Sequence, residues 1–136
     1  MQDTCFGEMT FKHGWIVNTQ LEWGDTRLTI KVKNLSTAEQ TITEFQRTVY
    51  LSFKNNTSTY VDTFQNALFR FCKKHYDPSL TKEQTLKVAT PVTMLIHRDN
   101  IWGVLFKVKW ESEINIAVKV TLPENKIECG VDDILL

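Results

Sequence analysis

The chain has 136 residues, of which 42% are hydrophobic and 24% are charged, values typical of one globular domain with its own core. Its net charge of zero argues against a general nucleic-acid binder, which needs an excess of lysine and arginine. It has no apolar run long enough to span a membrane and no secretory signal at the N-terminus. We therefore expect one domain, residues 1–136, that is soluble and cytoplasmic.

The three cysteines, Cys5, Cys72 and Cys129, are an odd number without a C-x-x-C pair. That pattern fits reduced thiols better than a disulfide framework. Cys72 and His75 have the i, i+3 spacing of two metal ligands on a helix, but nothing nearby in sequence completes the set of three or four that a metal needs. We expect a buried thiol beside a helix-end histidine, and no metal site.

Apolar and polar residues alternate through the first part of the chain, which indicates strands. Glycine-containing pairs at His13-Gly14 and Gly24-Asp25 indicate turns. The expected strands cover residues 8–12, 15–23 and 27–33. The opening segment is therefore predicted to be a β-meander.

The hydrophobic period becomes helical after residue 36. Thr41 with Glu44 and Thr43 with Gln46 both have the spacing of a capping box, in which a hydroxyl and a later side chain satisfy free N–H groups at a helix start. Either pair can begin the first helix. Its apolar face is predicted to comprise Ile42, Phe45, Val49 and Phe53.

Asn55-Asn56 closes this first predicted helix, and Thr57 or Ser58 can cap a second. Asp77-Pro78 ends the second helix, because proline disfavours helix in the residue before it. The two helices form a predicted αα-hairpin over about 41–76. The apolar stripe of the second comprises Tyr60, Val61, Phe64, Leu68, Phe71, Cys72 and His75.

After a polar stretch that can hold a short turn of helix, residues 78–88, the period returns to two at Pro91. A turn at 98–100 leads into a long hairpin over 101–122, which turns at residues 111–113, and a last short strand covers 126–129. One hairpin face is apolar. The other carries Lys107, Lys109, Asn115, Lys119 and Thr121, and is expected to face water.

Strands, two helices and then strands again make an α+β fold rather than an alternating one. We predict a largely antiparallel sheet with an αα-hairpin packed on one face, in the order βββ-αα-βββ plus a short C-terminal strand.

Enzyme motifs are absent: there is no glycine-rich phosphate loop, nucleophile elbow or H-E-x-x-H helix. Pairs of cysteine and histidine lack a local context that would lower a thiol pKa. Glu111 and Glu113 could approach each other like glycosidase carboxylates, but no substrate cleft is indicated. The four tryptophans lie on apolar strand faces, which favours the core over a sugar or base platform. No catalytic residue and no cofactor is predicted.

Acidic residues gather near the C-terminus, where six of them between 111 and 133 face two lysines, a net charge of −4. The helical segment is mainly basic in contrast. An acidic edge could dock on a basic partner and speed the encounter, whereas the plainer interpretation is that turn residues are charged because they are solvated. The candidate partner-binding residues are Glu111, Glu113, Glu128, Asp132 and Asp133.

Three stretches carry a resemblance: FGEMTFKHGW, TITEFQRTVYLSF, and WGVLFKVKWESEINIAVKV followed by GVDDILL. The chain resembles small bacterial α+β domains of unknown function associated with polymorphic-toxin immunity loci. It departs from their pattern at Asn115, where glycine is usual, and at 129–131, where Cys-Gly-Val replaces the closing Val-Gly. The matching positions are Phe6, Gly7, Ile42, Gln46, Trp110, Glu111, Glu113 and Asp132 or Asp133.

This resemblance implies a non-enzymatic immunity protein, of the kind found in contact-dependent inhibition, that binds a cognate protein toxin and occludes its active site. No direct contact with nucleic acid or membrane is expected, and an acidic edge would suit a basic nuclease toxin by imitating phosphate charge. Two alternatives stay open. One is a small enzyme or ligand-binding domain with a pocket between sheet and helices, and the other is an oligomerisation module with a large apolar patch.

Overall fold

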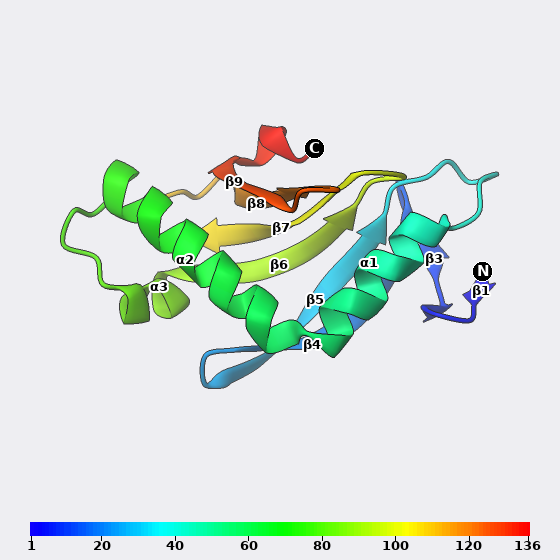
Figure 1. The fold of residues 1–136 in the computed structure, drawn as a ribbon, viewed down its shortest axis with the longest axis horizontal. Coiled ribbons are helices and arrows are strands. Elements are labelled where there is room, and N and C mark those ends of the chain that lie inside the picture. The colour runs from blue at the N-terminus through cyan, green and yellow to red at the C-terminus, as the bar shows by residue number, and fades with distance from the viewer.

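A computed structural model describes residues 1–136 and has helices on one face of a large sheet (Figure 1). The strands of the first half are β1 (Gln2–Asp3), β2 (Gly7–Glu8), β3 (Thr10–Phe11), β4 (Trp15–Trp23) and β5 (Thr26–Asn34). The helices are α1 (Glu44–Asn55), α2 (Thr57–His75) and α3 (Lys82–Val88). The second half adds β6 (Ala89–Ile96), β7 (Ile101–Val108), β8 (Ile116–Thr121), β9 (Lys126–Val131) and the 3-10 turn η1 (Asp132–Ile134).

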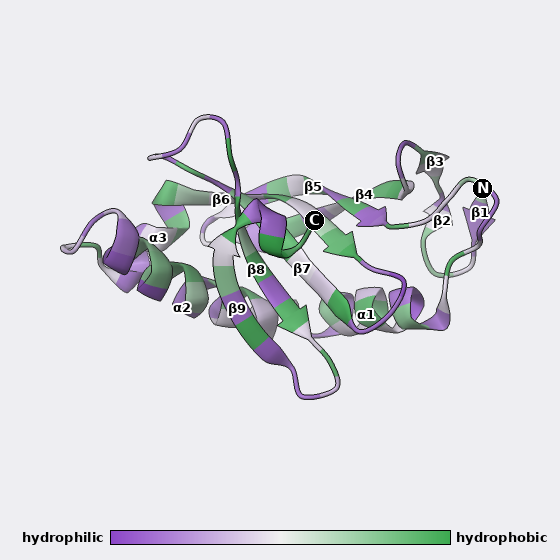
Figure 2. Ribbon diagram, turned by 90° about the horizontal axis from the view of Figure 1, so that it is seen from above, coloured by the Kyte–Doolittle hydropathy of each residue, from purple (hydrophilic) through white to green (hydrophobic).

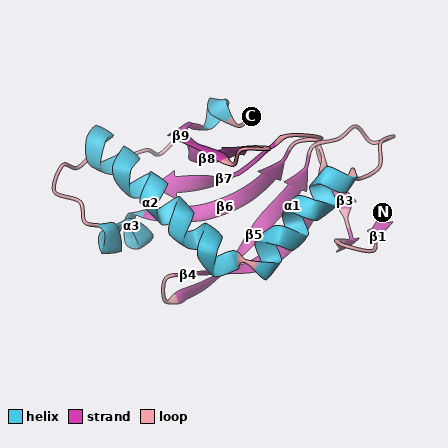
Figure 3. Cartoon of the chain, viewed as in Figure 1, coloured by secondary structure: helices cyan, strands magenta, loops and turns pink.

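Seven strands form the main sheet in the order β3-β4-β5-β6-β7-β8-β9, and only the β5–β6 pair is parallel (Figure 3). The predicted fold class, α+β with a largely antiparallel sheet and a helical pair on one face, is confirmed. The β5–β6 pair is parallel because α1, α2 and α3 connect the two strands. Such a long crossover lets β6 run in the same direction as β5. No helix is both long and apolar enough to cross a membrane.

The two long helices meet at Asn56 and diverge over the sheet (Figure 1). α1 lies over the β4 side, where Tyr50 and Lys54 reach Thr19, and α2 lies over β8 and β9. The expected cap at Thr57 or Ser58 is wrong. Asn56 is the N-cap, and its side chain makes no cap bond but donates to the carbonyl of Ser52 at 2.9 Å. Thr57 does not cap the helix either, because its hydroxyl donates to the carbonyl of Phe53 at 2.8 Å.

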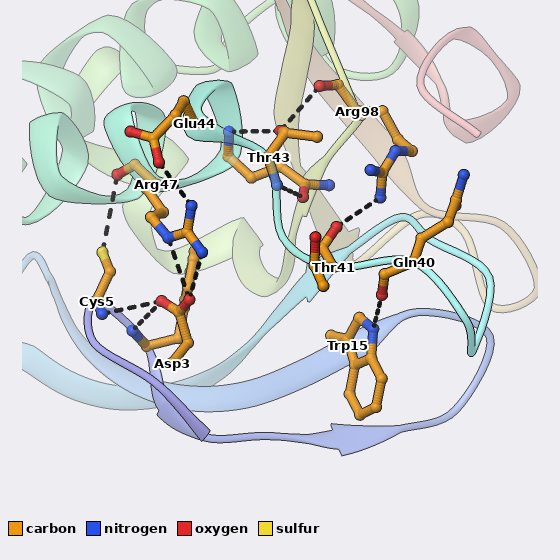
Figure 4. A network of polar contacts seen from close by, with 11 residues as sticks. Asp3, Cys5, Trp15, Gln40, Thr41, Thr43, Glu44, Arg47 and Arg98 are labelled. Atoms are coloured by element: carbon orange, nitrogen blue, oxygen red, sulfur yellow. Dashed lines mark hydrogen bonds and ion pairs between the residues drawn. The ribbon is translucent and has the colours of Figure 1, made fainter. Parts of the chain in front are cut away.

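The capping box of α1 uses Thr43 and Gln46, one of the two predicted pairs. The Gln46 side chain is fully buried, and its amide nitrogen donates to the carbonyls of Leu35 at 3.0 Å and Ile96 at 3.3 Å. The Thr43 hydroxyl donates to the carbonyl of Arg98 at 3.0 Å (Figure 4). The helix start is thereby fastened to the ends of both strands of the parallel pair. A second capping box, formed by the exposed residues Thr81 and Gln84, begins α3.

The predicted strand over 8–12 is wrong as a continuous element. It breaks at the buried Met9, and β2 pairs with β1 in a separate two-stranded sheet. The reason is Asp3, whose carboxylate accepts from the N–H groups of Cys5 and Phe6 and from the guanidinium of Arg47 at 2.8 Å (Figure 4). Burial alone would raise the pKa of Asp3, but these hydrogen bonds hold it below its usual value. The N-terminal segment is thus anchored to α1.

The core between sheet and helices is filled by apolar and aromatic side chains. Trp102 stands edge-on to Phe53 at 6.0 Å and to Phe64 at 5.8 Å between ring centroids. Trp23 and Trp102 are buried as predicted, whereas Trp15 and Trp110 are half-buried at its margin. The hairpin strands end at Val108 and resume at Ile116, so the connecting loop is longer than the predicted turn at 111–113.

The outer face of the hairpin is not uniformly wet as expected, because a second, smaller apolar cluster lies there. Leu135, which follows η1, is fully buried against Leu95, Leu105 and Ala117. Figure 2 shows this C-terminal segment lying over the sheet. The absent side chain of Gly103 makes room for it. A Cβ there would come 2.9 Å from the Leu135 side chain and 2.2 Å from the Val118 carbonyl oxygen.

Replacing Gln46 with leucine should lower the free energy of unfolding by about 3 kcal/mol, because buried backbone groups at three element ends lose a partner. Gln84→Leu removes the same capping contact at an exposed site and should cost no more than about 1 kcal/mol. Urea denaturation of both variants measures the difference. Equal losses would contradict the role assigned to the buried amide.

Gly103→Ala should lower the free energy of unfolding by about 2 kcal/mol, since the new methyl group overlaps backbone that cannot move freely. Gly130→Ala is a matched control on the neighbouring part of the same face, where a Cβ meets only Ile134 at an ordinary 3.4 Å. Its stability should stay within about 0.5 kcal/mol of the parent. Thermal unfolding of the pair tests the packing beneath the tail.

Candidate functional site

The β7–β8 loop and the η1 turn, which carry four of the five predicted acidic residues, lie at one end of the sheet. The ladder pairs Ile116 with Val131, so the loop before β8 adjoins the turn after β9. The N–H of Asp132 donates to the carbonyl of Asn115 at 3.0 Å, and the N–H of Asn115 donates to the Asp132 carboxylate at 3.4 Å. Glu113, two residues before Asn115, is thereby brought to the same end as Asp132 and Asp133.

Two aliphatic side chains are exposed at this end. Ile114 is 37% exposed and Val131 is 39% exposed. Ile114 was expected on the buried hairpin face, but it falls in the loop before β8 begins. We call the set Glu113, Ile114, Val131, Asp132 and Asp133 the acidic end. Exposed aliphatic groups rimmed by charge are typical of protein-binding surfaces.

Glu111 points away from the acidic end toward the end of α2. Its carboxylate accepts a hydrogen bond from the Tyr76 hydroxyl at 3.0 Å, and the adjoining Trp110 ring stacks on Tyr76 at 4.9 Å and 6°. Lys109 lies over the outer face of Trp110, 5.2 Å from its centroid. Burial, together with the contact to Glu111, raises the pKa of Tyr76 to about 12. Glu111 therefore fixes the loop rather than extending the acidic end.

Glu128 lies on β9 and is surrounded by positive charge. It forms an ion pair with Lys126 at 3.7 Å, and the ladder sets it opposite Lys119. The structure therefore does not join Glu128 to Glu113, Asp132 and Asp133. Three of the five predicted residues form one group, and the other two have partners within the fold.

Arrangements suited to nucleophilic or metal chemistry do not occur among the cysteines and histidines. Burial raises the pKa of Cys72 to about 11, and burial with the neighbouring Cys72 raises the pKa of Cys129 to about 12, so both thiols are protonated at neutral pH. His75 is exposed and stacks on Phe71, with 4.4 Å between ring centroids. No group of three His, Cys, Asp or Glu side chains is placed to hold a metal ion.

The largest cleft, of about 700 Å³, lies between the β4–β5 hairpin and the helices, at the margin of the filled core. Its polar side chains largely have partners already. Lys54 donates to the Thr19 hydroxyl at 2.7 Å, Asp62 pairs with Lys82 at 3.3 Å, and Gln65 donates to the Lys82 carbonyl at 2.9 Å. The cleft lacks a set of free polar groups converging on one point.

No family model, curated protein or solved structure matches this chain.

The sequence analysis missed the two exposed aliphatic residues of the acidic end. Ile114 was predicted to begin the second hairpin strand after a turn at 111–113, but the loop is longer and β8 begins only at Ile116. For Val131 there was no local signal, since its exposure depends on where η1 turns. A group of lysines on one face of the sheet was also not predicted, although its members Lys31 and Lys33 are two residues apart on β5.

Glu111→Gln should lower the pKa of Tyr76, because the variant removes a carboxylate that disfavours the tyrosinate. In the parent, the folded-state pKa lies above the ordinary value of 10.0, so Tyr76 contributes stability below pH 10 that declines as pH rises to about 12. NMR titration of ring-labelled tyrosine measures the pKa, with Glu113→Gln as the control. An unchanged pKa in Glu111→Gln would refute the contact.

Proposed function

We propose that this chain is a non-enzymatic protein-binding domain that neutralises a cognate bacterial toxin, as an immunity protein does, and that the acidic end is its contact surface. The observation that carries the proposal is the exposed pair Ile114 and Val131 with Glu113, Asp132 and Asp133 around it. The resemblance of the sequence to domains from toxin-immunity loci supports the same conclusion.

The acidic end suits binding because its backbone is already ordered. Asn115 and Asp132 are joined by two hydrogen bonds at the end of a sheet ladder, and Glu111 holds the loop to Tyr76. A surface that is rigid before binding loses little conformational entropy when its partner docks. The aliphatic pair supplies apolar contact, and the carboxylates select a basic partner and speed its approach.

A nuclease toxin is the partner class that fits this chemistry best. Its active site must attract phosphate groups, so it presents positive charge that carboxylates can meet. Glu113 and Asp133 are exposed on neighbouring segments and would take the place of phosphates, while Ile114 and Val131 exclude water from the contact. The toxin would be inhibited because its substrate could no longer enter.

A small-molecule-binding domain is the second candidate, and the 700 Å³ cleft is the observation that favours it. The acidic end is preferred because the cleft's Lys54, Asp62 and Gln65 are engaged within the protein. The cleft does lie between sheet and helices, where this hypothesis expects a pocket, but it is confined to the margin because the core fills the rest of that interface.

Co-expression with the toxin encoded beside this gene should yield a complex and restore growth. The double variant Glu113→Lys, Asp133→Lys should weaken the complex about 100-fold, because two attractive contacts become repulsive in a partly desolvated interface. Isothermal titration calorimetry and growth rescue measure the loss. Glu39→Lys, Glu124→Lys changes the net charge equally at exposed sites elsewhere and should change affinity by less than about threefold.

Absence of both complex and protection with the parent chain would reject the proposed function. A complex that tolerates Glu113→Lys, Asp133→Lys as well as the control does would reject only the acidic end as its contact surface.

A further inference from the structure

The outer face of the sheet, opposite the helices, retains an open groove beside the C-terminal tail. The tail is held by Leu135, whose carbonyl lies 2.6 Å from Nε2 of His97. Between the tail and strands β3–β5 the groove has a volume of about 220 Å³. We call it the basic groove; its side chains include Lys12, His13, Lys31 and Lys33, with Leu95 and Leu105.

The lysines of the basic groove have no ion-pair partner within the fold. Lys31 faces Asn18 and Thr93 across the ladder, and Lys33 faces Ile16 and Leu95. None of the groove lysines takes part in an ion pair, and no Asp or Glu side chain lines the groove, although the main-chain carboxylate of Leu136 belongs to a lining residue. Opposite charges across a ladder stabilise a sheet, whereas like charges close together repel. The positive charge here therefore favours an occupant that brings negative charge.

The spacing of the groove matches an extended polypeptide. Lys31 and Lys33 lie on the same face of β5, about 6.6 Å apart along the strand, which is also the repeat of side chains on one face of an extended peptide. Leu95 and Leu105 are both buried and form an apolar floor for the groove, and Leu136 adds an exposed apolar side chain at its edge. An occupant with alternating acidic and aliphatic side chains would satisfy both features.

We propose that the basic groove is a docking site for an extended acidic segment of a partner protein, in which successive carboxylates meet Lys31 and Lys33 and an aliphatic side chain covers the leucines. This site is separate from the acidic end, which lies on the β7–β8 loop, the end of β9 and η1, and it does not depend on the proposed function. Binding removes the repulsion between the unpaired lysines.

Nucleic acid is the less favoured occupant. The imidazole of His13 is the one ring that lines the groove, so successive unpaired bases would lack the series of aromatic side chains on which they stack. The leucines match aliphatic side chains rather than a sugar-phosphate backbone. The net charge of the chain is zero, whereas binding through phosphates alone depends on an excess of positive charge.

The test is an NMR titration of the ¹⁵N-labelled full chain with the capped peptide Gly-Glu-Val-Glu-Val-Glu-Gly. Amide shifts are expected at residues 10–16, 31–35 and 93–95, and they should weaken as salt rises. A peptide with lysine in place of glutamate should cause none. Glu113→Lys, Asp133→Lys should bind the acidic peptide as the parent does, which separates this result from the proposed function.

The double variant Lys31→Glu, Lys33→Glu should bind the acidic peptide at least about tenfold more weakly, because two attractions become repulsions. Lys73→Glu, Lys87→Glu carries the same charge change on the helices and should bind it unchanged. Circular dichroism checks that each variant is folded. If the double variant does not fold, Lys31→Glu alone, at an exposed position, should still weaken binding of the acidic peptide, though by a smaller factor.

Three outcomes would overturn the proposal. The first is an absence of shifts at millimolar peptide, or shifts outside the groove. The second is a response to oligo-thymidine with none to the peptide, which would assign the groove to nucleic acid. The third is concentration-dependent self-association that Lys31→Glu, Lys33→Glu abolishes, again with no peptide response, which would make a second copy of this chain the occupant.

Discussion

The buried side chain of Gln46 ties the start of α1 to the ends of β5 and β6, which the backbone also joins where the N–H of Leu35 donates to the carbonyl of Ile96 at 2.9 Å. Its amide nitrogen meets the ends of β5 and β6 through Leu35 and Ile96, and its oxygen accepts from the N–H of Thr43 at 3.0 Å. β5 and β6 are the one parallel pair, so their ends meet without a hairpin to fix them. The Gln46 amide therefore fixes the helical crossover onto the junction between the two halves of the sheet.

Local signals in the sequence were sufficient for most of the fold. Alternation predicted the strands, and capping chemistry placed the start of α1 within two residues. The choice between Thr41 and Thr43 needed tertiary information, because only Gln46 finds strand ends to bind. The start of α2 was mispredicted for a related reason. Thr57 follows α1 so closely that its hydroxyl meets the Phe53 carbonyl instead of capping its own helix.

The outer face could not be predicted because its cover comes from far along the chain. Leu105 and Ala117 are apolar residues on the hairpin face that was predicted to be exposed, and nothing in the local sequence explained the glycine at position 103. Leu135 reaches Gly103, Leu105 and Ala117 only once β9 has paired with β8 and η1 has turned the chain back. The acidic residues show the same limit. They are close in sequence, but Glu111 contacts Tyr76 and Glu128 contacts Lys126, so these two are separated from the others.

The C-terminal tail links the two surfaces for which partners are proposed. Asp132 and Asp133 belong to the acidic end, while Leu136, three residues later, lines the basic groove. Between them Leu135 is fully buried over the hairpin, and its carbonyl contacts His97. The same five-residue segment therefore carries negative charge at one end of the sheet and closes off a positive groove on its outer face. The net charge of zero conceals this separation, because the opposite charges are sorted in space and do not neutralise one another locally.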